Sequence, residues 1–119
     1  MDISKLSYEK KIQLAKNPNT PVEVLAALAK DEDYYVRYGV ARNPNSPVGV
    51  LAELAKDEYS YIRYWVADNP NSPIEALAVL LSVELQGNWD KYTLKAIFNH
   101  LNSTDTIRAI IKTVFPGVQ

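Results

Sequence analysis

Hydrophobic residues recur along this chain at the three- and four-residue spacing of amphipathic helices. In one stretch, Val22, Leu25, Leu28 and Ala29 fall on a single helical face and predict a short helix. No stretch shows the strict apolar and polar alternation of a half-buried strand. The pattern therefore predicts an all-α protein.

A second helical pattern follows the first after a charged link, over residues 34–42, and its core positions are Val36, Gly39 and Val40. The counterpart over residues 60–67 has Ile62, Trp65 and Val66 in the core. Gly39 thus aligns with Trp65. Either the indole leans into the space that the glycine leaves, or that space is a shallow pocket.

This pair of helices belongs to a sequence repeat of 26 residues. Asn17, Asn43 and Asn69 open the same phrase, and residues 16–41 and 42–67 agree at 18 of 26 positions. One unit of this length cannot bury its own apolar face, so neighbouring units must stack into a shared core. Two short antiparallel helices per unit predict an α-solenoid.

The predicted solenoid is a single domain over residues 1–119. It comprises a half-repeat, two full repeats, a partly degenerate third repeat and divergent C-terminal capping helices, which are residues 7–15, 16–41, 42–67, 68–87 and 88–119. In the last two segments we expect helices over 74–85, 89–101 and 106–115.

The C-terminal segments depart from the repeated pattern in several predicted ways. Gln86-Gly87-Asn88 should stop the helix before it. The apolar face of the next helix is expected to be Leu94, Ile97, Phe98 and Leu101. Asn102 to Asp105 reads as a worn copy of the repeated turn, after an insertion of about six residues.

Each unit opens with Asn-Pro-Asn, which predicts a turn because the residue before proline avoids the α region. A hydroxyl residue and a proline follow, as Thr20-Pro21, Ser46-Pro47 and Ser72-Pro73. We expect the hydroxyl to cap the next helix and the proline to occupy its first position. Glu23 and Glu75 would then complete capping boxes.

Composition restricts the possible functions. The 119 residues carry a formal net charge of -1, so the chain lacks the positive field that draws proteins to nucleic acids or anionic lipids. The absence of cysteine excludes disulfides, thiolate metal sites and cysteine nucleophiles. With a charged N-terminal segment and no apolar span of about 18 residues, we expect a cytoplasmic protein that makes no membrane contact.

The phrase NPNTPVEVLAALAKDEDYYVRYGVA resembles the variant leucine-rich repeat family. The likeness lies in the turn, in a Val-Leu-x-x-Leu-Ala helix, in an Asp-Glu link and in a Val-Arg-x-x-Val-Ala helix, and it covers residue 7 to about residue 81. It implies a right-handed superhelix related to HEAT-like scaffolds. One type of member holds iron and sulfur on an N-terminal cysteine cluster, which this chain lacks, so the resemblance implies a binding scaffold without a cofactor.

Repeated polar residues suggest two ladders along the stack. Arg37 and Arg63 hold one position of successive units, and Asp31 and Asp57 hold another, so Arg to Asp contacts between units are favoured over an anion-binding stripe. A ladder that satisfies turn backbones is likewise favoured over a row of ligand-binding amides for the repeated asparagines, which are Asn17, Asn43, Asn69, Asn19, Asn45 and Asn71.

Aromatic residues concentrate in the two second helices, where six tyrosines and a tryptophan occur: Tyr34, Tyr35, Tyr38, Tyr59, Tyr61, Tyr64 and Trp65. The core positions leave Tyr35 and Tyr38 as a neighbouring pair outside the core, and Tyr61 and Tyr64 repeat that pair. We call these four residues the tyrosine stripe. The stripe is either a recognition face, with Trp65 and Arg42 beside it, or a set of rings that shield helix packing.

Parts for catalysis are scarce. His100 is the single histidine, and the four glycines are too scattered to form a phosphate-binding loop. We expect a non-catalytic scaffold, without metal or cofactor, that binds a protein or peptide and is a monomer rather than an oligomer. The alternative is a HEAT-like nucleic-acid-binding module that uses the tyrosines as stacking platforms and takes its positive charges from Arg37, Arg42, Lys56 and Arg63.

Overall fold

The computed structural model describes residues 2–87 and 89–118. In that part of the chain every regular element is helical and there is no strand, so the prediction of an all-α protein is confirmed. The elements are a 3-10 helix η1 (Ile3–Lys5) and the helices α1 (Tyr8–Lys16), α2 (Val22–Leu28), α3 (Tyr34–Arg42), α4 (Val48–Leu54), α5 (Ser60–Asp68), α6 (Ile74–Leu85), α7 (Lys91–Asn99) and α8 (Asp105–Val114).

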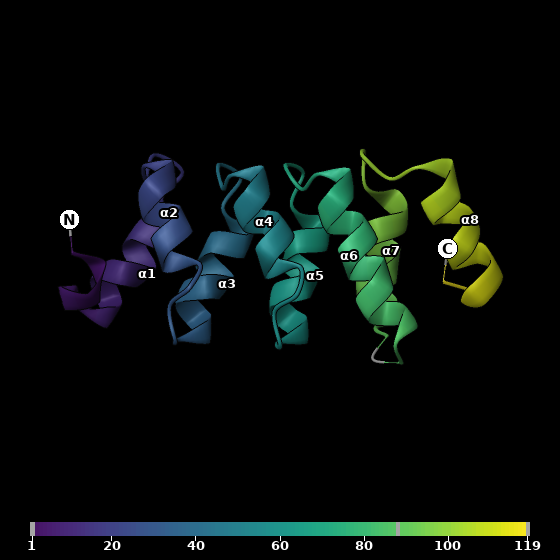
Figure 1. Cartoon of the computed structure of the whole chain (residues 1–119), viewed down its shortest axis with the longest axis horizontal. Helices are drawn as coiled ribbons and strands as arrows, with labels where there is room; N and C mark the ends of the chain where they lie inside the picture. The colour runs from purple at the N-terminus through teal and green to yellow at the C-terminus, as the bar shows by residue number, and fades with distance from the viewer. Residues whose placement is uncertain (1, 88, 119) are drawn as a thin grey trace.

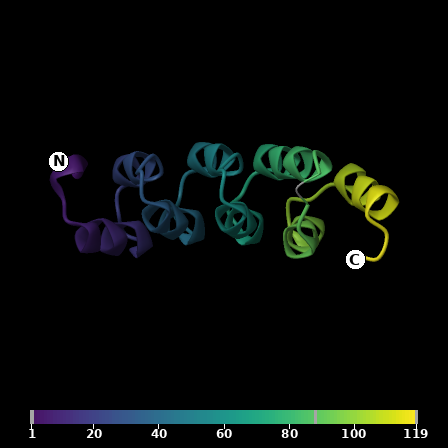
Figure 2. The ribbon, with the colours of Figure 1, turned by 90° about the horizontal axis from the view of Figure 1, so that it is seen from below.

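The helices form two layers along an elongated molecule of 48 × 23 × 16 Å (Figure 1). Helices α1, α3, α5 and α7 lie side by side in one layer, and α2, α4 and α6 lie in the other (Figure 2). Helix α8 follows at the end of the array and packs on α7. The two termini lie at opposite ends of the long axis, and each helix contacts only its near neighbours in the sequence.

One continuous apolar core lies between the layers. Leu25, Leu28 and Leu51 are completely buried on the first helices of their pairs, and Val36, Val40, Ile62 and Val66 are buried on the second helices. Val22 was also expected in the core, but it is 46% exposed. Val22 is the first residue of α2, one turn before the completely buried Leu25, and the core does not extend to it. Trp65 is half-buried rather than a core residue.

The capping prediction was wrong. The hydroxyls of Thr20, Ser46 and Ser72 do not cap the helices that follow; they donate to the carbonyl oxygens of Leu14, Val40 and Val66 at 2.6, 2.7 and 2.6 Å. Each of these carbonyls accepts from the C-cap amide three residues on, but the residue four positions on is a proline without an N–H, so the hydroxyl supplies the missing second donor. The N-cap position falls to Pro21, Pro47 and Pro73, and Glu23 and Glu75 form no capping box.

Of the three C-terminal helices, only α7 is shorter than the sequence suggested. Helix α7 begins at Lys91 and ends at Asn99, so Trp89 and Leu101 lie outside it, and Leu101 is 87% exposed. Helix α6 ends as predicted, because Gly87 adopts a positive φ of 106° directly after its C-cap. Asn88, the last residue of the predicted stop, lies outside the described residues.

The asparagine ladder is confirmed as a structural device. Asn43 Nδ2 donates to the carbonyl oxygens of Ala15 and Asn17 at 2.9 and 3.0 Å. Asn69 repeats the arrangement on the carbonyls of Ala41 and Asn43 at 2.8 and 3.0 Å. Both side-chain amides are buried, and each forms one rung of the ladder. Each rung satisfies backbone carbonyl oxygens of a turn that water cannot reach.

The last rung of the ladder is an imidazole. His100 Nε2 lies 2.7 Å from the carbonyl oxygen of Asn69, and Asn102 Nδ2 donates to the carbonyl of Ser72 at 3.0 Å. This rung is 31 residues from the one before it, whereas the earlier rungs are 26 apart. The repeated turn therefore resumes at His100, not at Asn102 as predicted. A helix surface or a cap position was expected for His100, and it is the buried C-cap of α7.

Candidate partner-binding surface

The predicted site residues all lie on the layer of α1, α3, α5 and α7. Tyr35 and Tyr61 are exposed, with half and 71% of their surface accessible, whereas Tyr38, Tyr64 and Trp65 are half-buried. Arg42 is exposed at the end of α3. Hollows lie between consecutive helices of this layer, and each is lined by aromatic side chains.

Between α3 and α5 the side chains of the protein pack on one another. The guanidinium carbon of Arg42 lies 4.3 Å from the ring centre of Trp65 and 5.5 Å from that of Tyr38. Arg42 also donates to the Tyr38 hydroxyl at 3.3 Å. Tyr38 and Tyr64 both meet Trp65 edge to face, at 6.1 and 5.2 Å. The structure thus brings four of the predicted residues into one aromatic cluster around a cation.

A second aromatic group lies at the other ends of α3 and α5. Tyr34 stacks on Tyr35 with ring centres 4.3 Å apart and on Tyr59 at 4.9 Å. Tyr35 also approaches Tyr38 edge to face at 6.5 Å, which connects this group to the cluster around Arg42. Ring stacking is what the packing interpretation of the stripe predicts, and the exposure of Tyr35 and Tyr61 is what the recognition interpretation predicts.

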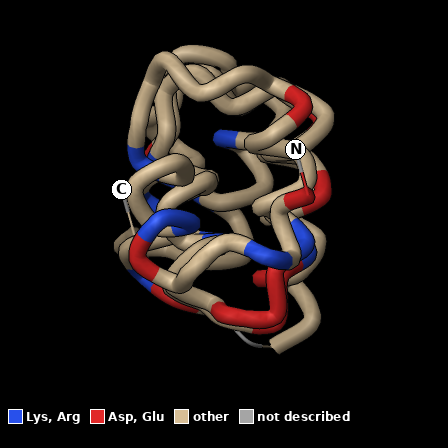
Figure 3. Tube along the Cα trace, turned by 90° about the vertical axis from the view of Figure 1, so that its left-hand side faces the viewer, with Lys and Arg blue, Asp and Glu red and all other residues tan. Residues whose placement is uncertain are grey.

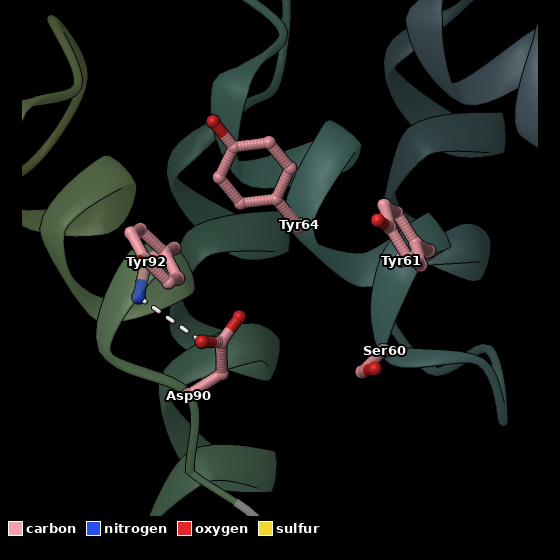
Figure 4. A pocket seen from close by; sticks show the side chains of 5 residues that line it. All are labelled: Ser60, Tyr61, Tyr64, Asp90 and Tyr92. Atoms are coloured by element: carbon pink, nitrogen blue, oxygen red, sulfur yellow. Dashed lines mark hydrogen bonds between the residues drawn. The ribbon is translucent and has the colours of Figure 1, made fainter.

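Between α5 and α7 lies a pocket of about 310 Å³ that no side chain of the protein fills. It is lined by Ser60, Tyr61, Tyr64, Asp90 and Tyr92. Figure 4 shows the three tyrosine rings around the opening, with the carboxylate of Asp90 between Tyr92 and Ser60. Asp90 caps α7, because its Oδ1 accepts from the Tyr92 amide at 3.1 Å and its Oδ2 accepts from the Thr93 hydroxyl at 2.9 Å.

Tyr92 and Asp90 were missed by sequence reasoning. Tyr92 follows Tyr61 by the same 31-residue interval that separates His100 from Asn69, so it extends the exposed row of Tyr35 and Tyr61 onto α7. This correspondence between Tyr61 and Tyr92 can be recognised only when the position of the inserted residues before α7 is known.

Gly39 is explained by the approach of α1. A methyl group added at Gly39 would come within 2.8 Å of the Ala15 Cβ, so α1 and α3 can lie this close only with glycine there. A hollow of about 300 Å³ lies beside it, lined by Lys16, Tyr38, Gly39, Arg42 and Asn43. Of the two alternatives for this position, the shallow pocket is the one observed, because Trp65 packs on Tyr38 and Arg42 instead.

The predicted Arg to Asp contact between successive helix pairs forms at Arg37 but not at Arg63, and a lysine makes the same contact one interval earlier. Arg37 Nε donates to Asp57 Oδ2 at 2.9 Å, and Lys11 Nζ donates to Asp31 Oδ2 at 2.8 Å one unit earlier. Burial alone would raise the pKa of Asp31, but the hydrogen bonds from Lys11 and the Asp33 amide, with the charges of Lys11 and Arg37, lower it. Across the molecule, acidic and basic residues are interspersed (Figure 3).

Arg63 is the next arginine of the series, and at the 31-residue interval that holds beyond α6 the residue matching Asp57 is Asn88, so the sequence provides no carboxylate there. Arg63 is buried and its Nη1 donates to the carbonyl of Asp57 at 2.7 Å. The nearby carboxyl of Glu84 is also buried, and its Oε2 accepts from the Asp90 amide at 2.6 Å. Burial raises the pKa of Glu84, although the Asp90 amide and the charge of Arg63 both act to lower it.

The described residues contain no group of three or more His, Cys, Asp or Glu side chains arranged to hold a metal ion. None of the described helices combines the length and apolar composition needed to cross a membrane. No protein-family model, no curated protein and no solved structure matches the chain.

Proposed function

We propose that this protein is a non-catalytic α-solenoid scaffold that binds a protein or peptide through the layer of α1, α3, α5 and α7. The observation that carries the proposal is the row of partly exposed aromatic side chains on this layer, which are Tyr35, Tyr38, Tyr61, Tyr64, Trp65 and Tyr92. Tyr, Trp and Arg are enriched at protein interfaces because they offer large, stiff contact areas with polar tips.

The solenoid part of the proposal rests on the sequence repeat and on the ladders. Asn43 and Asn69 make equivalent hydrogen bonds 26 residues apart, and Lys11 and Arg37 make equivalent ion pairs at the same interval. The resemblance to the variant leucine-rich repeat family adds a right-handed superhelix to the proposal. We further propose that the protein is a scaffold without metal or cofactor that acts in the cytoplasm as a monomer.

The hollows between helices provide recesses on this surface that could receive side chains of a partner. The one between α1 and α3 has a volume of about 540 Å³ and is lined by Tyr8, Glu9, Ile12, Gln13, Lys16, Tyr35, Tyr38 and Arg42. An extended peptide running across the layer would cross this hollow, the Arg42 cluster and the pocket between α5 and α7 in turn. Apolar anchors in pockets with a polar rim are the usual source of binding energy in such interfaces.

The test is a capture experiment followed by direct affinity measurement. Partners retained by the intact protein are identified, and the best is titrated against the double variant Tyr35→Ala/Tyr61→Ala. These two exposed tyrosines are expected to contribute about 1 kcal/mol or more together, which is a loss of at least about five-fold in affinity. The matched control is Val48→Ala, an exposed side chain on α4 in the opposite layer. Equal binding by both variants would refute the proposed face.

Nucleic-acid binding is the second candidate, favoured by the exposed tyrosines beside Arg42. Two of its four predicted cations are already engaged, because Arg37 pairs with Asp57 and the buried Arg63 donates to a carbonyl. A binding assay with a single-stranded oligonucleotide at two salt concentrations separates the candidates. Phosphate contacts would weaken steeply with salt, whereas a mainly aromatic protein interface would not.

A further inference from the structure

The pocket between α5 and α7 has an unusual combination of walls. Three phenol rings, those of Tyr61, Tyr64 and Tyr92, face a single carboxylate, that of Asp90 (Figure 4). Aromatic faces carry a negative quadrupole and attract cations, and a carboxylate adds a full negative charge and hydrogen-bond acceptors. This chemistry suits an organic cation and disfavours anions and neutral apolar groups.

The chain provides its own comparison between α3 and α5. There the positions equivalent to Ser60 and Asp90 are Tyr34 and Tyr59, whose rings stack with centres 4.9 Å apart. The α5–α7 pocket therefore has a hydroxyl and a carboxylate where the preceding helix pair has two stacked rings. A second carboxylate, that of Asp68, lines the adjoining hollow, and Asp68 follows Arg42 by one 26-residue interval.

We propose that this pocket receives an arginine side chain of a partner peptide, whose guanidinium would lie against the rings of Tyr61, Tyr64 and Tyr92 and donate to Asp90. The inference rests on the proposed function, since it identifies one anchor of the partner that the scaffold binds.

Arginine fits better than the other cationic side chains for two reasons. Its planar guanidinium stacks on aromatic faces, as that of Arg42 does on Trp65 between α3 and α5. Its several N–H donors can also reach Asp90, where each oxygen accepts one internal hydrogen bond and keeps acceptor capacity. A quaternary ammonium would satisfy the rings but could not donate to the carboxylate.

The charges around the pocket support a cationic occupant. Burial raises the pKa of the Tyr64 phenol, and the negative charges of Asp68 and Asp90 raise it further. Two lysines lie nearby without lining the pocket: Lys95 borders the adjoining hollow, and Lys91 Nζ lies 5.4 Å from the centre of the Tyr92 ring. Lys91 shows that this ring attracts a cation, and it is a competitor that the experiment must remove.

The experiment is a titration of the isotope-labelled protein with short capped peptides, followed by NMR. Each peptide places one test residue between glycines and serines: arginine, its neutral isostere citrulline, lysine or trimethyllysine. We expect the arginine peptide to shift the signals of Tyr61, Tyr64 and Tyr92. The citrulline peptide should bind about five- to ten-fold more weakly, because it keeps the shape but loses the charge.

Variants identify the groups responsible. Asp90→Asn keeps an N-cap of equal quality and should weaken the arginine peptide by about three- to five-fold. Tyr92→Leu should weaken it by about two- to five-fold, and the control Tyr59→Leu, an exposed tyrosine outside the pocket, should not. Lys91→Met should leave binding unchanged or strengthen it. Signals outside the pocket report whether each variant is folded.

Three results would overturn the proposal: equal binding of arginine and citrulline peptides, tighter binding of trimethyllysine than of arginine, or no specific shifts at the pocket. None of these results bears on the wider scaffold. If they occur while the Tyr35→Ala/Tyr61→Ala variant still loses its captured partner, the arginine anchor is wrong and the binding face stands.

Discussion

Arg37 and Asp57 join two successive helical pairs across a part-buried contact, with Arg37 Nε 2.9 Å from Asp57 Oδ2. Arg37 Nη1 also donates to the carbonyl oxygens of Asp31 and Glu32 at 2.8 and 3.0 Å. One side chain thus satisfies a carboxylate of the next unit and the backbone between the helices of its own unit. Such a residue links units rather than standing free for a ligand.

Replacing Arg37 by methionine keeps the aliphatic stem but leaves Asp57 and both carbonyls without this partner. We expect the free energy of unfolding to fall by about 3 kcal/mol, the usual scale for breaking a poorly solvated ion pair. The control is Asp105→Asn, which removes the exposed contact between Asp105 and Arg108 at 3.6 Å. That change should cost less than about 0.5 kcal/mol in the same denaturant titration.

Asn43→Ala tests the asparagine ladder. It removes two hydrogen bonds to the carbonyls of Ala15 and Asn17 and leaves these groups without that donor, so we expect a loss of about 2 to 4 kcal/mol. Asn17→Ala, at the exposed start of the ladder, loses only a local turn contact to the Asn19 amide. It should cost about 1 kcal/mol or less in thermal and urea unfolding. Equal losses would contradict the role given to the buried rungs.

Leu51→Ala and Leu54→Ala test the apolar core at the centre of the array. Both leucines are almost fully buried, so each change should destabilise by roughly 2 to 5 kcal/mol. Val48→Ala lies on the same helix at an exposed position and should cost under about 0.5 kcal/mol. A loss below about 1 kcal/mol for either leucine would mean that the core has been placed on the wrong face.

Thermal melts of the tyrosine stripe separate recognition from packing. Tyr61→Ala and Tyr35→Ala should cost about 1 kcal/mol or less, because both rings are exposed. Tyr38→Ala and Tyr64→Ala should cost more, roughly 1 to 3 kcal/mol, because these rings pack against Trp65. Losses above about 3 kcal/mol at most of the four sites would assign the stripe to structure.

Glu84→Gln should change how stability depends on pH. A carboxyl whose pKa is raised in the folded state stabilises it fully below the usual value of 4.5, and that contribution is lost as the pH rises through the folded pKa. Glutamine keeps an acceptor for the Asp90 amide and does not titrate. The variant should therefore become more stable relative to the parent as the pH rises above 4.5, which urea unfolding of both proteins at a series of pH values would measure.

The helices were predictable because the sequence states their pattern more than once. Val36, Val40, Ile62 and Val66 are buried as expected, since any face that stacks on a neighbour must be apolar in each copy. Val22 was misplaced because a helical wheel shows the angle of a residue but not how far along the helix the cover extends. The prolines were assigned to the wrong helix position because the hydroxyl residue before each of them has two possible backbone partners. It can bond to the end of the preceding helix or to the start of the following helix, and the sequence does not show which of the two it chooses.

The candidate pocket could not be predicted from the sequence. Its walls come from α5 and from the segment that begins α7, which the inserted residues move out of the 26-residue register. At a spacing of 26 residues Tyr92 has no counterpart in the preceding repeat, and the sequence indicates only an N-cap role for Asp90. For the same reason the replacement of asparagine by His100 in the ladder was hidden, although both side chains reach a carbonyl oxygen in the same way.

The reach of the ladder side chains has a consequence for how such a chain can grow. The side-chain amide nitrogen of Asn69 donates to the segments just before and at Asn43, and that of Asn43 donates to those just before and at Asn17. No rung depends on the total number of rungs. Duplicating residues 42–67 in tandem should therefore give a longer protein in which every junction is one that already exists, with added stability from each new junction. Gene duplication could therefore change the length of this protein, and the layer of α1, α3, α5 and α7 would lengthen with each added copy.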